Sequence, residues 1–162
     1  MMHRSILGLS LVVGLAGLSG SAWSQTFKDQ LIGTWNLVSV TEDYGGGKVL
    51  KDPFGPNPGG GITFSPNGRM MFMIIGADLP TKPTKPQESW RLVVAYYGTY
   101  TVNEADHTVS LHPEKATIPA FDGSTRIVHF TINGDELIEK GIHPIKGPTG
   151  PFTPTEVYKR AT

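Results

Sequence analysis

Residues 59–75 read GGGITFSPNGRMMFMII, and this stretch decides the fold class of the chain. Two apolar runs rich in strand-forming residues flank a Ser-Pro-Asn-Gly segment, in which Asn and Gly tolerate the positive φ angles of a tight turn. The stretch therefore predicts a β-hairpin. In its second strand both alternating sets of side chains are apolar, so alternation does not decide whether Phe72 or Met73 faces the core.

Similar runs, separated by Gly, Pro, Asn and Asp, extend from this hairpin in both directions. Helix is expected only briefly, as one turn at 27–32 and as two turns at 88–95, where Val93 and Val94 also suit a strand. The Pro-rich stretches 77–87 and 141–154 are expected to be loops, as are the glycine triplets 45–47 and 59–61, which do not open a helix as a phosphate-binding loop would. Strands are expected at 31–41, 59–64, 69–75, 96–103, 108–114, 126–132, 136–140 and 157–160.

Such a pattern describes an all-β protein with strands mostly in hairpin order. An antiparallel sheet of this size hides its edges by pairing with a second sheet or by closing on itself, and only closure removes the edges altogether. The pattern alone leaves a sandwich and a barrel open.

Five short motifs, in one order along the chain, carry a resemblance. They are Gly33–Ser39 (GTWNLVS), Pro53–Gly55 (PFG), Gly60–Met70 (GGITFSPNGRM), Tyr97–Tyr100 (YGTY) and Phe130–Leu137 (FTINGDEL). On these motifs the chain, from about Leu31 to Arg160, resembles the bacterial and fungal lipocalin-like domain proteins. The resemblance implies an antiparallel up-and-down β-barrel of the lipocalin and calycin kind, with about eight or nine strands and at most one short helix.

The same resemblance implies how one end of the barrel is closed. Trp35, in the Gly-x-Trp motif, would pack under the cavity, and a basic side chain of the last strand, Lys159 or Arg160, would cover its indole ring. Members of this family share no single established activity, so the likeness implies shape more than chemistry. The Pro-rich stretch 141–154 lies where a strand pair would help to close the barrel. The sequence therefore leaves open whether the barrel closes completely.

Residues 1–24 have the three parts of a secretory signal peptide. Arg4 supplies the positive charge, Ile6 to Leu18 is apolar, and Ala22 and Ser24 are small residues at the −3 and −1 positions. We expect cleavage between Ser24 and Gln25, which leaves residues 25–162 as one lipocalin-like domain. The expected location is the periplasm, or the medium for a host without an outer membrane. The apolar run is too short and too rich in glycine for a membrane anchor.

Charge and composition exclude other functions for the exported domain. The chain has 14 basic and 14 acidic residues and no cysteine. A net charge near zero without a basic cluster argues against a nucleic-acid partner. Residues 25–162 contain no apolar run long enough to span a membrane, and without cysteine the fold depends on its sheet and core.

Catalytic and metal-binding patterns are weak. Serine has no recognisable motif linking it to a histidine, and cysteine is absent. His112 and Glu114 share a strand face but make only two ligands, with Pro113 between them, so no metal is expected and no cofactor is assigned. His112 and His129 lie in predicted strands and carry the hypothesis of an isomerase or cyclase that moves a proton with a strand His or Tyr.

Residues on strands supply the remaining candidates for a binding site. Arg126, if it points inward, needs a carboxylate partner from the protein or from a ligand. Tyr97 and Tyr100 lie on opposite faces of one strand, so only one can line the cavity. The favoured function is non-catalytic binding of a small, largely hydrophobic molecule, and the third hypothesis is an envelope interaction protein with a filled barrel that binds through its Pro-rich loops. Candidate ligand-binding residues are Trp35, Phe72, Met73, Tyr100, His112, Arg126 and His129.

Overall fold

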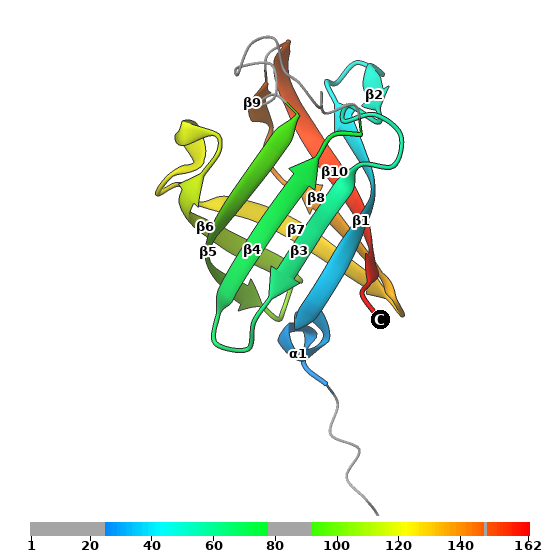
Figure 1. The fold of residues 1–162 in the computed structure, drawn as a ribbon. Helices are drawn as coiled ribbons and strands as arrows, with labels where there is room; N and C mark the ends of the chain where they lie inside the picture. Colours follow the sequence, from blue (N-terminus) through cyan, green and yellow to red (C-terminus); the bar gives the residue numbers. More distant parts are fainter. Residues whose placement is uncertain (1–24, 78–91, 148) are drawn as a thin grey trace, which may run out of the picture.

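A computed structural model describes residues 25–77, 92–147 and 149–162, and this part of the chain is almost entirely β-structure (Figure 1). Its strands pair antiparallel in the order β2-β1-β3-β4-β5-β6-β7-β8-β10-β9, and β1 also pairs with β10. The sheet therefore closes into an eight-stranded barrel, to which β2 and β9 are extra strands. The bounds are α1 Phe27–Leu31, β1 Gly33–Asp43, β2 Val49–Lys51, β3 Gly59–Phe64, β4 Arg69–Ile75, β5 Val93–Asn103, β6 Thr108–Ala116, a 3₁₀ turn Pro119–Phe121, β7 Arg126–Asn133, β8 Glu136–Gly141, β9 Ile145–Gly147 and β10 Gly150–Arg160.

Closure depends on β10, which is much longer than the sequence predicts. It begins at Gly150 and pairs with β1 from Thr153↔Asp43 to Arg160↔Trp35. The expected loop 141–154 is wrong for most of its length, because its second half is strand and β9 pairs with β10. Pro151 and Pro154 precede the residues of β10 that pair with β8, so neither proline interrupts that ladder. The predicted barrel is confirmed as complete.

The predicted hairpins β3–β4, β5–β6 and β7–β8 are all present. The expected helix 88–95 is wrong at its end, because β5 begins at Val93, and residues 88–91 lie outside the described chain. Residues 93–95 pair with β4, and β-branched valines pack well on such a ladder, so pairing overrides a weak helical preference.

Glycines 59–61 lie within β3, which confirms the expected strand 59–64 and not the alternative of a hairpin loop at this triplet. A Cβ atom added at Gly61 would collide with the backbone carbonyl of Trp35, and one at Gly60 with that of Met73. The absence of side chains therefore lets neighbouring strands approach closely where the wall bends.

The interior is filled by side chains that alternate along each strand. In β4, Met70, Phe72 and Ile74 are buried, whereas Met71 and Met73 face outward, which settles the alternation that the sequence left open. The centre of the core is aromatic. Phe64 packs edge-on against Tyr100 and Phe130, with ring centroids 4.9 and 5.6 Å apart.

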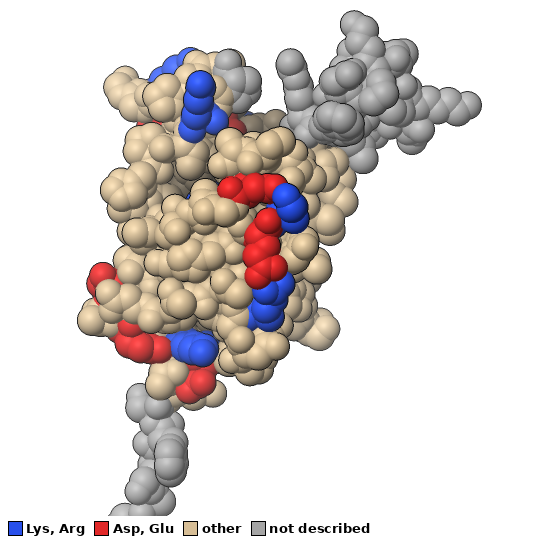
Figure 2. Space-filling model, turned by 90° about the vertical axis from the view of Figure 1, so that its left-hand side faces the viewer, with Lys and Arg blue, Asp and Glu red and all other residues tan. Residues whose placement is uncertain are grey.

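Some of the charged side chains on the outside form ion pairs. Figure 2 shows a short strip of alternating acidic and basic side chains on one side of the barrel, and two ion pairs, Arg69–Glu114 and Lys115–Asp122, lie in this region. No helix among the described residues has the length and apolar character needed to cross a bilayer.

Candidate functional site

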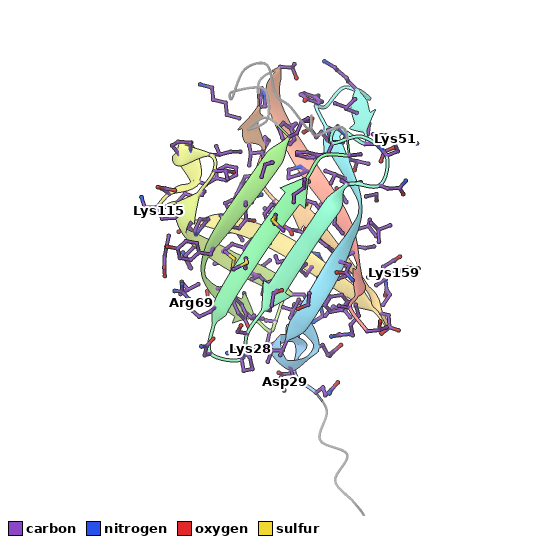
Figure 3. All side chains as sticks on the ribbon, viewed as in Figure 1. Lys28, Asp29, Lys51, Arg69, Lys115 and Lys159 are labelled. Carbon is purple, nitrogen blue, oxygen red and sulfur yellow. The ribbon has the colours of Figure 1, made fainter. Side chains whose placement is uncertain are left out.

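One end of the barrel is sealed by α1 and a stacked cation. The indole Nε1 of Trp35 donates to the Leu31 carbonyl at 2.8 Å. The guanidinium of Arg160 lies 3.9 Å from the centre of the same ring and donates to the carbonyls of Gln30 (2.8 Å) and Ile32 (3.2 Å). Lys159, the other candidate cover, is exposed and projects away from the barrel (Figure 3). The hydrogen bonds and the stacking of Arg160 therefore hold α1 and Trp35 together at this end.

Farther up the barrel, two glutamates face the interior from neighbouring strands. Glu139 of β8 and Glu156 of β10 are direct cross-strand partners. Glu139 is fully buried and Glu156 is only 4% exposed. The Tyr158 hydroxyl donates to Glu139 Oε2 at 3.1 Å, but Glu139 Oε1 and Glu156 Oε2 have no hydrogen-bond partner. Like charges directly opposite each other in a sheet are unfavourable, and buried acceptors without donors are costly.

Arg126, at the start of β7, is the nearest positive charge to this acidic pair. Its Nη1 donates to the Tyr96 hydroxyl at 2.7 Å, and its guanidinium lies 5.5 Å from the Tyr96 ring and 5.0 Å from that of Phe121. Its Nε is buried and has no acceptor. The expected carboxylate partner is therefore close by, but no ion pair within 4.0 Å joins Arg126 to either glutamate.

Burial dominates the titration of this cluster. Loss of hydration raises the pKa of Glu139, although the charge of Arg126 and the Tyr158 hydrogen bond act in the opposite direction. Burial and the like charge of Glu139 raise the pKa of Glu156 well above its ordinary value, again opposed by Arg126. Burial also raises the pKa values of Tyr96 and Tyr158, so both phenols keep their protons. The acidic pair therefore favours retention of a proton.

A cavity of about 210 Å³ opens beside Arg126, where β8 ends and β7 begins. Its walls include Val128, Gly141 and Pro154. Gly141 and Pro154 are each one inward-facing position above Glu139 and Glu156 on the same strands, so the cavity lies next to the acidic pair. Since glycine has no side chain, Gly141 leaves room above Glu139.

The predicted site residues separate into four groups. Arg126 and Phe72 meet through Tyr96, because Phe72 stacks on the Tyr96 ring with centroids 4.5 Å apart. Trp35 belongs to the sealed end. Tyr100, rather than Tyr97, faces inward and donates to the Ser65 carbonyl at 2.9 Å in the packed core.

The other three predicted residues lie on the outer face. Met73 is 39% exposed and His129 is exposed. His112 alternates with the buried Leu111 and Pro113, and its Nδ1 is 3.1 Å from Thr125 Oγ1. None of these side chains lines the interior, so the proton-transfer hypothesis has neither His112 nor His129 at the cavity, and the histidine that lines it is His143.

Sequence reasoning missed Glu139, Glu156, Tyr96 and Tyr158. Alternation along the strands gives one indication. Glu139 is two residues from Leu137, and Glu156 is two residues from Tyr158, so each glutamate shares a strand face with an apolar or aromatic residue. However, Ile138 and Val157 are also apolar and have the opposite parity, so alternation alone does not place the acids inside. Among the described residues, no three His, Asp or Glu side chains converge as a metal site would require.

Comparison with known proteins agrees with this architecture. The model of a family described as a lipocalin-like domain matches residues 32–147. Searches of curated proteins and of solved structures gave no match.

Proposed function

Because this chain belongs to the family of lipocalin-like domain proteins, we propose that it is an exported, non-catalytic binding protein that holds a small, largely hydrophobic molecule in its barrel. Barrels of eight strands have room for side chains and, where these leave a gap, for one small ligand. The ligand enters from the end opposite Trp35, because α1 and Arg160 cover the Trp35 end.

One observation carries this proposal: buried polar atoms without partners lie beside a cavity whose lining is partly apolar and partly polar. Ligand sites typically combine apolar lining with a few convergent polar groups. Here Val128, Ile145 and Pro154 supply apolar wall, and Arg126 supplies a donor at the cavity edge. A barrel that served only as a scaffold would gain stability from apolar residues at these positions.

Native mass spectrometry of the protein purified from its own host tests the binding function. We expect a bound mass that is lost on organic extraction, and the extract identifies the compound. Protein without any bound species, which also fails to bind every member of a library of small hydrophobic compounds, contradicts the proposal.

Export is tested separately by the mass of the protein recovered from the periplasm or the medium. The signal-like composition of residues 1–24 supports cleavage, and the expected product begins at Gln25. Recovery of the uncleaved chain from the cytoplasm alone contradicts export and leaves the binding function in place.

A second candidate, a barrel enzyme that moves a proton with a tyrosine, is supported by the hydrogen bond between the buried Tyr158 and Glu139. The extracted compound distinguishes the two. A binding protein returns an added sample of that compound unchanged, whereas an isomerase or cyclase converts it to a product with a different chromatographic retention.

A further inference from the structure

The acidic pair specifies the chemistry of the ligand more narrowly than the barrel shape does. Glu139 and Glu156 face each other across β8 and β10 and each has a buried oxygen without a donor. Apart from the proton that the acidic pair itself retains, no N–H or O–H group of the described residues reaches these oxygens. A ligand that fits here must therefore bring hydrogen-bond donors.

The charge of the cluster also favours a ligand that carries hydrogen-bond donors. The cluster contains two carboxyl groups and one guanidinium, so its charge is negative when both acids are ionised and zero when one holds a proton. The guanidinium is partly engaged, because Nη1 donates to Tyr96 and its face lies over Tyr96 and Phe121. A ligand carboxylate placed here would approach two acidic groups for one cation, whereas a ligand cation would be attracted by both acids.

We propose that the ligand is an amphipathic amine whose protonated nitrogen binds between Glu139 and Glu156. This inference rests on the proposed binding function and names the class of its ligand. An ammonium group has three N–H donors, enough to satisfy the two unpaired carboxylate oxygens with one to spare. Its apolar part extends past Gly141 and Pro154 into the cavity beside Arg126.

Nearby aromatic rings stabilise the charge of Arg126. Tyr96, Phe72 and Phe121 form a connected aromatic group, with Phe72 stacked on Tyr96 and Phe121 edge-on to it. Arg126 occupies the faces of Tyr96 and Phe121, so the attraction for a ligand cation comes from the two acids and is opposed by the charge of Arg126.

The test compares three probes of equal chain length: octylamine, octanoate and octanol. Each is titrated into the full chain by calorimetry at neutral pH. We expect octylamine to bind at least tenfold more tightly than octanol, a difference of about 1.4 kcal/mol, and octanoate to give no measurable heat.

Two isosteric variants locate the amine site. Glu139→Gln and Glu156→Gln are each expected to weaken octylamine binding at least tenfold, because an amide lacks the charge and offers one acceptor oxygen. Glu136→Gln is the matched control, since Glu136 lies on β8 with the outward-facing parity, and its affinity is expected to equal that of the unmodified protein. Circular dichroism checks that each variant folds, and the probe comparison on the unmodified protein decides the proposal even where a variant does not fold.

Failure of the amine assignment is distinguishable from failure of binding. Tighter binding of octanoate than of octylamine overturns the amine assignment and places an anion at Arg126. Equal binding of octylamine and octanol, unchanged in the glutamine variants, also overturns it. In both cases the binding function stands. If none of the probes binds and no compound is extracted from the native protein, both proposals fail.

Discussion

Two of the arginines that lie over aromatic rings, Arg160 and Arg126, differ in how completely their hydrogen bonds are satisfied. Arg160 stacks on Trp35 and donates to two backbone carbonyls at the end of α1. Arg126 stacks on Tyr96 and Phe121, makes one hydrogen bond to a phenol, and leaves its Nε without an acceptor.

This difference distinguishes the structural plug at the Trp35 end from the proposed ligand site beside Arg126. At the sealed end the Trp35 indole and the Arg160 guanidinium both have protein hydrogen-bond partners, and none of the buried side-chain atoms without partners among the described residues lies there. Near Arg126 three buried atoms lack partners, two of them on the acidic pair. Buried groups of this kind reduce stability, and proteins keep them where they contribute to binding or chemistry.

The largest expected effect comes from removing the ring under the plug. Trp35 is fully buried and holds α1 through its indole nitrogen. Trp35→Ala is expected to lower the free energy of unfolding by about 3–5 kcal/mol, because it leaves a cavity and frees Arg160 and α1 together. Urea unfolding measures this loss. A loss below about 1 kcal/mol would mean that the plug is not part of the folded core.

Exchanging each arginine for methionine compares the two sites directly. Arg160→Met is expected to cost about 2–3 kcal/mol, because it leaves the Gln30 and Ile32 carbonyls without their donor. Arg126→Met is expected to cost less than half as much at about pH 4, below the ordinary pKa of 4.5 from which burial raises the pKa values of Glu139 and Glu156. Lys159→Met, at an exposed neighbour of Arg160, is the control and should change stability by less than about 0.5 kcal/mol. Equal losses at the two arginines would contradict the distinction.

The sealed end could be predicted from the sequence because its parts are local. A Gly-x-Trp motif begins one strand, and a cation two residues from the chain terminus ends another, and the family likeness brings the two together. The structure adds which cation is used, Arg160, and the carbonyls of α1 that it bonds.

The acidic pair could not be predicted in the same way. Glu139 and Glu156 are neighbours only because β10 pairs with both β8 and β1, and β10 begins at Gly150 in a stretch whose prolines indicate a loop. The register of a closing strand depends on contacts far apart in the chain. Local alternation does not contain that information, since apolar residues lie on both faces of β8 and β10.

Titration of the acidic pair predicts how pH changes stability. The folded-state pKa of Glu156 is raised above the ordinary value of 4.5 by burial and by Glu139, with Glu42 adding to the rise and Arg126 opposing it. A carboxyl group with a raised pKa contributes most to stability while it is protonated, below its unfolded pKa, and that contribution is lost as pH rises through the folded pKa.

Replacing this carboxyl group should remove that loss. Glu156→Gln is expected to be nearly neutral at about pH 4 and to raise the free energy of unfolding by about 1–2 kcal/mol at about pH 8. Urea unfolding across this pH range measures the effect, with Glu136→Gln as the control. A variant that is less stable than the parent at about pH 8 would indicate that Glu156 is ionised and well paired in the fold.

The smallest expected effect concerns the outer face of the barrel. His112 and His129 both lie outside the interior, so the double variant His112→Gln, His129→Gln should bind octylamine within about twofold of the parent, a free-energy change of about 0.4 kcal/mol. Outer-face substitutions away from buried networks rarely change stability by more than about 0.5 kcal/mol. A tenfold loss of affinity measured by calorimetry would connect an imidazole to the ligand. That result would mean that a histidine takes part in ligand binding, and the contrast between an outer face without a binding role and a polar interior would no longer hold.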